Sequence, residues 1–225
     1  MKEGHLMKKI GISLLSLFTF LFFASSAFAV TGEGAARLIT TTKHTAIQGT
    51  LTIPSAWNVS NDGSYIAFYL GLGVVCEGGI SFKPSTGWNK FLNCGGGEGS
   101  ASNKTAPLTV QPKAGDTISL KLVNNLNDTA TLYVNGVAAY TNLPVANAGA
   151  LKAATTVKMV HSTLDNQDKN SYTNASFSNV LVQSQSGGSY TTFPSNISPD
   201  FPLGGKGDYV INSSNPLGTT LKAGK

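Results

Sequence analysis

The sequence after residue 45 is a succession of short segments with strand-like patterns, separated by turns rich in Gly, Pro and Asn. Residues 46–53 and 116–126 alternate apolar and polar side chains, as expected for strands with one buried face. Residues 64–75 are apolar almost throughout, which is typical of an inner strand covered on both faces, with a bend or bulge at Gly71 and Gly73. No stretch has sustained helical periodicity. The sequence therefore predicts an all-β fold, an antiparallel β-sandwich or jelly roll.

Further strands are expected at residues 80–83, 88–92, 129–134, 155–160, 176–183 and 190–193. Asn135-Gly136 directly follows one of these segments and predicts a two-residue hairpin turn. Residues 161–173 read as a polar loop. We predict one sandwich domain over residues 30–193. A tail rich in Pro, Gly, Ser and Asn follows at 194–225, and it either wraps along the sandwich or is disordered.

Residues 1–29 have the three-part organisation of an export signal. Lys8 and Lys9 precede an apolar stretch at 10–23, and Ala27-Phe28-Ala29 offers the small residues that signal peptidase requires before Val30. The apolar stretch is short for a membrane span and has no basic stop after it. We expect a secreted protein that has no membrane association after cleavage, with either Met1 or Met7 as its start.

The charge pattern argues against nucleic acid as a partner. The full chain has 16 basic and 11 acidic residues; cleavage before Val30 removes three basic and one acidic residue and leaves a formal charge of +3. The lysines that remain are scattered singly, with no basic patch interleaved with aromatic residues. Abundant Ser, Thr, Asn and Gly instead fit an extracellular sheet protein.

Two cysteines, Cys76 and Cys94, remain after cleavage of the signal. Export to an oxidising exterior makes a disulfide between them the simplest interpretation. Closing a loop of this length stabilises a fold by about 3 kcal/mol in the chain-entropy model. The alternative, a nucleophilic or metal-binding thiol, lacks a paired histidine nearby.

Three segments carry a resemblance to known proteins: Tyr-Ile-Ala-Phe-Tyr-Leu-Gly at 65–71, Cys-Glu-Gly-Gly-Ile-Ser-Phe at 76–82 and Gly-Trp-Asn-Lys-Phe at 87–91. They resemble the concanavalin-like lectin and glucanase sandwiches, and among these most nearly the secreted glutamic peptidases. Residues 114–120 look like the Pro-Gly-Asp turn that enters a long strand in that family. The chain is also similar to the secreted YrpD-type proteins of Bacillus, which implies export and no mechanism.

The catalytic pair of the glutamic peptidases is not kept. Glu77 stands where that family has its catalytic glutamine, and Asn89 or Lys90 stands where it has its catalytic glutamate. That chemistry needs an amide that polarises the substrate carbonyl and faces the developing oxyanion. It also needs a carboxylic acid within hydrogen-bond reach of the attacking water, to transfer the proton. We therefore expect no peptidase activity.

Glu77 and Glu98 are the candidate catalytic carboxylates, because the Cys76–Cys94 bridge would bring their segments together. A pair of carboxyls facing one groove can hydrolyse a glycosidic bond. The alternative is that Glu77 pairs with Lys90 and that Glu98 is a solvated loop charge.

Aromatic side chains are candidates for a stacking platform, because sugar rings present apolar faces while Asn and Ser bond their hydroxyls. The candidates are Trp57, Trp88, Tyr65, Tyr69, Tyr133 and Tyr140, of which at least half should be core. Trp88, beside the disulfide-linked loop, is the preferred exposed residue. Together with Tyr69, Glu77 and Asn89, it forms the predicted ligand-binding set.

Asp165, Asn166, Asp168 and Asn170 cluster in one loop, and oxygen-rich loops can hold Ca²⁺. The spacing misses the EF-hand template, and a turn rich in amides and carboxylates is the ordinary alternative. His44 and His161 have no triad or zinc motif around them. No cofactor is expected, with Ca²⁺ at Asp165 and Asp168 as the alternative.

Three functions remain open from the sequence. The first is a non-catalytic binding module for a polysaccharide or cell-wall polymer, on a sandwich whose concave sheet carries aromatic and amide side chains. The second is a glycan hydrolase that uses Glu77 and a second acid. The third is a structural or interaction protein of the cell surface.

The cleavage site can be tested by mass spectrometry of the secreted protein, whose first residue we expect to be Val30. Ala29→Trp should block processing, because signal peptidase accepts only small residues there, whereas Ala29→Gly should be processed normally. A chain in the culture medium that still carries residues 7–29 would contradict this prediction.

Overall fold

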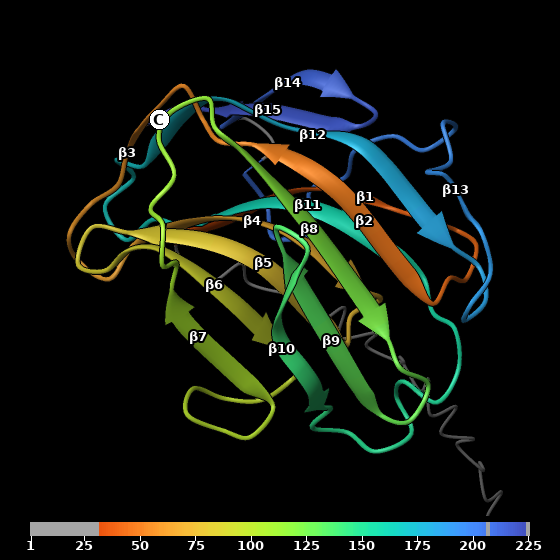
Figure 1. The fold of residues 1–225 in the computed structure, drawn as a ribbon. Coiled ribbons are helices and arrows are strands. Elements are labelled where there is room, and N and C mark those ends of the chain that lie inside the picture. Colours follow the sequence, from red (N-terminus) through yellow and green to blue (C-terminus); the bar gives the residue numbers. More distant parts are fainter. Residues whose placement is uncertain (1–31, 206–207, 224–225) are drawn as a thin grey trace, which may run out of the picture.

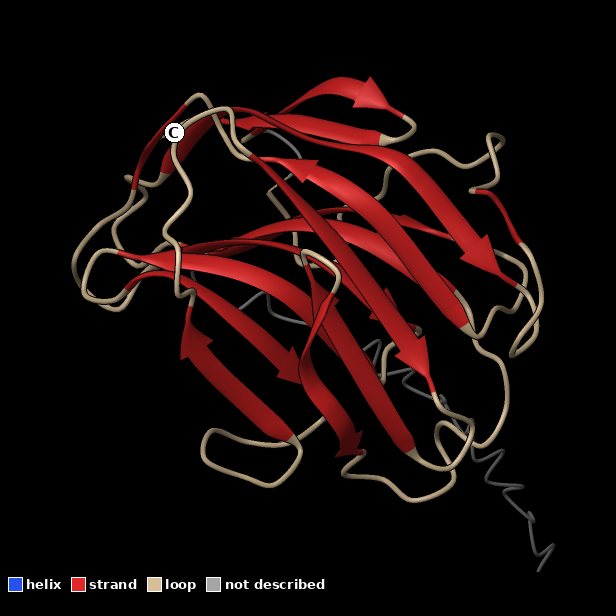
Figure 2. Ribbon diagram, viewed as in Figure 1, coloured by secondary structure: helices blue, strands red, loops and turns tan. Residues whose placement is uncertain are grey.

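The computed structural model describes residues 32–205 and 208–223, and all regular elements within them are strands. The strands form two antiparallel sheets packed face to face (Figures 1 and 2). The predicted antiparallel β-sandwich is therefore confirmed. The expected signal peptide lies outside the described residues, and within the part described no helix is long and apolar enough to cross a membrane.

One sheet has six strands in the order β1-β11-β4-β5-β6-β7. Their bounds are β1 (Glu33–Ile39), β4 (Tyr65–Leu72), β5 (Cys76–Lys83), β6 (Gly87–Asn93), β7 (Asn103–Pro107) and β11 (Val157–Leu164). The predicted inner strand is β4, which pairs with β11 on one side and β5 on the other. All its residues after Tyr65 are buried, because one face packs between the sheets and side chains of the neighbouring strands pack against the other.

The second sheet has nine strands, seven of them in the order β10-β9-β8-β2-β12-β15-β14, while β3 and β13 pair with β12. Their bounds are β2 (Ala46–Thr52), β3 (Ala56–Asn58), β8 (Thr117–Asn124), β9 (Thr129–Val134), β10 (Val137–Pro144), β12 (Ser171–Gln183), β13 (Tyr190–Thr192), β14 (Tyr209–Ser214) and β15 (Leu217–Leu221). Asn135 and Gly136 connect β9 to β10 with φ of 51° and 77°, as a two-residue hairpin turn requires.

The period-two pattern of the strands builds the core between the sheets. In β8, Ile118, Leu120 and Leu122 are buried while their neighbours are partly or fully exposed. In β4, one face contributes Ile66, Phe68, Leu70 and Leu72 to the same core. The other face of β4 carries Ala67 and Tyr69, which belong to a second, smaller apolar cluster on the outside of the six-stranded sheet.

The sandwich does not end at residue 193, where the sequence predicted its boundary. Residues 209–221 form β14 and β15, and β15 pairs with β12 inside the nine-stranded sheet. Leu217 and Thr219 are fully buried. The composition of this segment resembles a tail because its strands are short and alternate Thr, Ser and Asn with few apolar residues.

The predicted polar loop at 161–173 is also shorter in the structure, because β11 continues to Leu164 and β12 begins at Ser171. His161 lies on the core face of β11 and is completely buried. Its Nδ1 is 2.7 Å from Thr219 Oγ1, which also lies 2.6 Å from the Tyr172 hydroxyl. The imidazole packs edge-on against Phe68, with 5.0 Å between ring centroids. Burial lowers the pKa of His161 to about 3.

The buried histidine predicts a loss of stability in mild acid. Its pKa in the folded state, about 3, is below its unfolded value of about 6.5, so the unfolded state binds the proton first as pH falls. The free energy of unfolding should be constant above pH ~6.5 and about 3 kcal/mol lower by pH ~4.5. Urea unfolding of the wild type and His161→Gln across this range measures the effect.

His44→Gln is the matched control, because burial lowers the pKa of the less buried His44 in the same direction. We expect His161→Gln to flatten the pH dependence much more than His44→Gln. Equal slopes in His161→Gln and the wild type would contradict the assignment.

Candidate binding groove on the six-stranded sheet

A groove of about 790 Å³ lies on the outer face of the six-stranded sheet. Its apolar floor is formed by Tyr65, Ala67, Tyr69 and Phe91. These residues belong to the second apolar cluster, which also contains the buried Ala35 and Val160. The polar lining residues are Glu33, Glu77, Ser81, Lys83, Asn93, Glu98, Asn103, Lys104, Thr105, Ser162 and Thr163. The volume lies within the range of ordinary ligand sites in proteins.

The alternation of β5 aims its polar residues at this groove. Cys76, Gly78 and Ile80 face the core, where a side chain on Gly78 would meet Leu92 and two leucines of the opposite sheet. The intervening Glu77, Ser81 and Lys83 line the groove. A strand with this pattern presents every second side chain to each face.

The Cys76–Cys94 disulfide is present, as predicted, and joins the start of β5 to the residue after β6. It anchors the loop that leads to β7, which is closed by a 2.8 Å hydrogen bond from Cys94 N to Ser102 O. The side chain of Asn93 accepts hydrogen bonds from the backbone amides of Gly95 and Gly96. This loop carries the exposed Glu98 to the wall of the groove that also contains Glu77.

Glu77 forms an ion pair with Lys158 of β11, with 2.5 Å between Oε1 and Nζ. The two residues are separated by one strand, because the register places Lys158 opposite Gly71 and Gly71 opposite Glu77. Gly71 continues both ladders and forms no bulge; its missing side chain leaves room for the stem of Lys158. The lysine side chain is 6% exposed and the glutamate side chain 37%.

Lys90, the partner that the sequence offered for Glu77, lies elsewhere. Its ammonium is 6.0 Å from the ring centroid of Tyr140 in β10. Lys158 takes its place because strand register joins residues that are 81 positions apart in the sequence.

Two tyrosines of β4 give the groove its aromatic character. Tyr69 packs edge-on against Phe91, with ring centroids 5.7 Å apart, and burial together with the charge of Glu77 raises its pKa well above the usual value. Tyr65 is less buried, and the ammonium of Lys83 lies 5.5 Å from its ring centroid. Burial, followed by the charges of Glu33 and Glu77, raises the pKa of Tyr65. Both phenols are therefore neutral hydrogen-bonding groups at neutral pH.

The prediction that Trp88 is an exposed ligand contact is wrong. Trp88 is 1% exposed and belongs to the core between the sheets. Its ring centroid lies 5.3 Å from those of Trp57 and Phe82. Trp88 is paired with Phe82 in the ladder, so both rings point to the core face.

Asn89 is also buried, on the opposite face of β6, and does not line the groove. Its amide donates hydrogen bonds to Thr86 Oγ1 and to Gly87 O, at 2.8 and 2.7 Å. These bonds hold the turn between β5 and β6, so Asn89 has a structural role in place of the predicted ligand contact.

The loop proposed for calcium is organised by Asp165, which is largely buried. The carboxylate of Asp165 accepts hydrogen bonds from the backbone amides of Lys169 and Asn170, at 3.0 and 2.5 Å. Asp168 is exposed, with φ of 56°. Within the ranges that the structure describes, no three His, Cys, Asp or Glu side chains are grouped as metal ligands. The geometry of Asp165 matches the ordinary turn that the sequence offered as the alternative.

Sequence reasoning did not find several residues at this site. The groove-lining residues Phe91, Glu33 and Leu203, and Lys158, the partner of Glu77, come from four separate segments. The signal for Phe91 was present, because it stands two residues after Asn89 and three after the core residue Trp88 in a strand with period two. The positions of Lys158, Glu33 and Leu203 at this site depend on which segments are neighbours in space, and the sequence gives no local signal for that.

Comparisons with known proteins define the fold class. No protein-family profile matches the sequence, and no curated protein matches it, so the similarity to YrpD-type proteins stays a prediction. Scytalido-glutamic peptidase, solved with a peptide-based transition-state analogue, is 9% identical, with a TM-score of 0.57 over 86% of this chain and 98% of that chain. SCP-B of the eqolisin peptidases, solved in complex with the tripeptide Ala-Ile-His, is 9% identical, with a TM-score of 0.55 over 85% of this chain and 98% of that chain. The β-glucanase of Bacillus licheniformis is more distant, with 16% identity and a TM-score of 0.40 over 66% of this chain and 70% of that chain.

The protein is therefore a concanavalin-like β-sandwich with the fold of the glutamic peptidases, as the sequence resemblance predicted. At such low identity the likeness shows the fold alone.

The space that Gly71 leaves for Lys158 can be tested by mutation. A Cβ at Gly71 would lie 2.7 Å from Lys158 Cγ, so Gly71→Ala should displace the lysine stem and lower the free energy of unfolding by about 1–3 kcal/mol. Gly97→Ala is the control, because a Cβ there meets nothing within 4 Å. Urea unfolding measures both changes, and the control should stay within about 0.5 kcal/mol of the wild type.

A double-mutant cycle identifies the cause. In a Lys158→Ala background, Gly71→Ala should cost much less, because the stem is gone. An undiminished cost in that background would show that Lys158 is not the neighbour that excludes a side chain from position 71.

Proposed function

We propose that the protein is a secreted, non-catalytic binding module for a glycan or cell-wall polymer, and that the groove on the six-stranded sheet is its binding site. The observation that carries this proposal is the grouping of Tyr65, Tyr69 and Phe91 on the floor of a groove whose polar lining combines amides and hydroxyls with carboxylates and lysines. Pyranose rings combine apolar faces with polar edges, so a ligand of this class fits such a surface.

The aromatic and the polar side chains of the groove have different roles in binding a sugar. Tyr65 and Phe91 are partly exposed and supply apolar contact area, whereas Tyr69 is nearly buried and supports Phe91 from below. At the end of β6 and the start of β7, Asn93 offers its Nδ2 and Asn103 its Oδ1, since Asn93 Oδ1 and Asn103 Nδ2 bond the backbone of the loop. Lys83 lies over Tyr65 and limits the ligand on that side.

The surroundings of the Glu77 and Glu98 carboxylates favour ligand binding over catalysis. One oxygen of Glu77 is already held by Lys158, and Glu98 lies on an exposed loop. Glycosidases position two carboxyls on opposite sides of the scissile bond, and their supporting contacts fix both groups. Here only Glu77 is fixed, and its partner is a cation.

A glycan hydrolase is the second candidate, because Glu77 and Glu98 line the same groove. In this mechanism one carboxyl protonates the leaving oxygen and the other acts as base or nucleophile. Lys158 would have to release Glu77 when substrate binds.

Binding to a panel of purified cell-wall and plant polysaccharides tests the proposal. We expect at least one polymer to bind, and Tyr65→Ala to weaken it by about tenfold, since an aromatic contact contributes on the order of 1 kcal/mol beyond its buried area. Tyr140→Ala is the matched control, a half-buried tyrosine outside the groove. Near-UV circular dichroism establishes that both variants are folded.

The other outcomes separate the remaining functions. If no polymer binds, the proposal is wrong and a structural or interaction role takes its place. If reducing ends are released from a polymer and this activity is lost in Glu77→Gln and Glu98→Gln, the protein is a hydrolase.

A further inference from the structure

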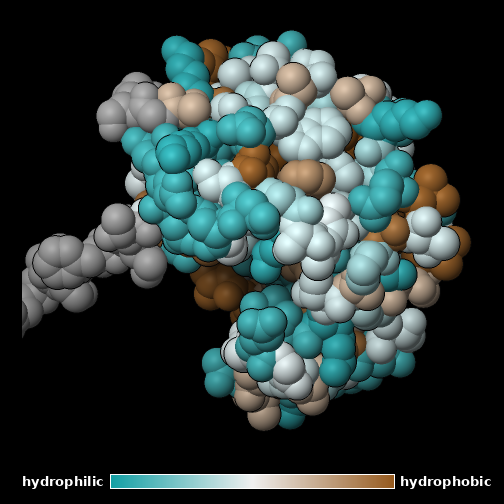
Figure 3. Space-filling view, turned by 90° about the vertical axis from the view of Figure 1, so that its left-hand side faces the viewer, coloured by the Kyte–Doolittle hydropathy of each residue, from teal (hydrophilic) through white to brown (hydrophobic). Residues whose placement is uncertain are grey.

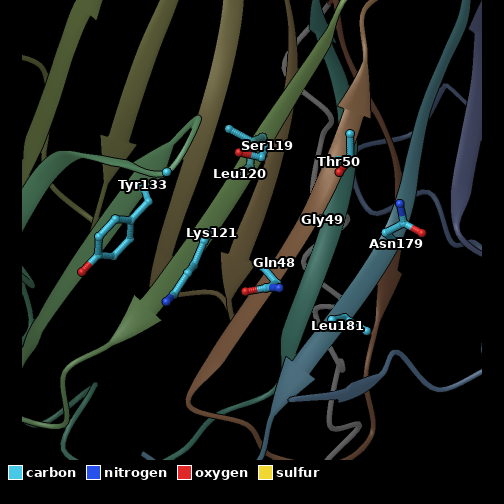
Figure 4. Close-up of a pocket in the computed structure, with 10 residues that line it drawn as sticks. Gln48, Gly49, Thr50, Ser119, Leu120, Lys121, Tyr133, Asn179 and Leu181 are labelled. Carbon is cyan, nitrogen blue, oxygen red and sulfur yellow. The ribbon is translucent and has the colours of Figure 1, made fainter. Parts of the chain in front are cut away.

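A second groove, of about 380 Å³, lies on the nine-stranded sheet (Figure 4). It is lined by Gln48, Gly49, Thr50, Ser119, Leu120, Lys121, Tyr133, Gly136, Asn179 and Leu181. None of these residues lines the groove described above on the six-stranded sheet. The groove is therefore a separate feature of the molecule.

Strand register builds this groove from one row of side chains. Leu181 is opposite Gln48, Gln48 opposite Lys121, and Lys121 opposite Tyr133, on four neighbouring strands. Their chain neighbours Ile47, Leu120 and Leu122 are buried in the core, so the row faces outward. Figure 4 shows Tyr133, Lys121 and Gln48 side by side along β9, β8 and β2.

Lys121 is held between two aromatic rings. Its ammonium lies 5.0 Å from the ring centroid of Tyr133 and 5.7 Å from that of Tyr190 in β13. Cation–π contacts position an ammonium without neutralising its charge. The described residues that line the groove include no Asp or Glu, so Lys121 is its sole charged lining residue there. The result is an oriented positive charge surrounded by amide and hydroxyl groups.

We propose that this second groove binds an anionic group carried by a hydroxyl-rich polymer. Lys121 binds the carboxylate or phosphate, while Gln48, Thr50 and Asn179 supply hydrogen-bonding groups for the hydroxyls beside it. The site is independent of the proposed function, because it lies on the other sheet and shares no lining residue with the first groove.

Affinity measurements with three soluble polymers test the site: polygalacturonate, which carries carboxylates, poly(glycerol phosphate), and a neutral β-glucan. We expect one or both anionic polymers to bind at low ionic strength. Lys121→Gln should weaken that binding by about tenfold or more, the loss of one charge-assisted hydrogen bond, and Lys121→Arg should retain it. Added salt should weaken the wild type, because salt screens the exposed charge.

Lys43→Gln is the matched control, because Lys43 is exposed, lines neither groove, and its replacement changes the net charge by the same amount. It should leave binding of the anionic polymers unchanged, whereas Tyr65→Ala should affect the first groove alone. Equal losses in Lys121→Gln and Lys43→Gln would mean that net charge is responsible and would overturn the site. Failure of both anionic polymers to bind the folded wild type would also overturn it, whatever the result for the neutral polymer.

Discussion

The two-sided burial of β4 is the constraint on which the rest of the structure depends. Its even-numbered residues, Ile66 to Leu72, fill the space between the sheets, and its odd-numbered residues build the floor of the outer groove. A shift of register by one residue would exchange these sets and place Phe68 in the groove and Tyr69 in the core. The pairing of β4 with β11 and β5 therefore sets the fold and the candidate site together. Seen from the side in Figure 3, hydrophilic and intermediate residues cover most of the surface, while some apolar residues are recessed and others protrude at the right-hand edge.

Local patterns predicted the parts of the fold that depend on adjacent residues. The inner strand β4, the alternating strands β2 and β8, the Asn135-Gly136 turn and the Cys76–Cys94 bridge were all readable from the sequence. The end of the domain was not, because Leu217 to Leu221 contains two buried leucines among small and hydroxylic residues that resemble a tail. His161 was assigned to a loop because a histidine counts as polar, although Val157, Met159 and His161 share one face.

The candidate site was harder to predict than the fold. Glu77 and Glu98 both line the first groove, and the disulfide links the segments that carry them. The sequence misplaced Trp88 and Asn89, because Trp88 adjoins the disulfide-linked loop, although the period of β6 puts Trp88 and Leu92 on the core face and Asn89 on the other. Lys158 could not be inferred at all, because its ion pair with Glu77 is formed across a third strand, and the order of strands in a sheet has no local signature.

The C-terminal hairpin has a consequence for how the chain matures. Thr219 accepts or shares the hydrogen bonds of His161 and Tyr172, and the Tyr209 hydroxyl bonds Gly34 O in the first strand. A nascent chain that has not yet emerged as far as β15 leaves these buried polar groups without their Thr219 partner and leaves β12 without its pairing to β15. Cooperative closure of the sandwich must therefore wait for the last strands to be synthesised.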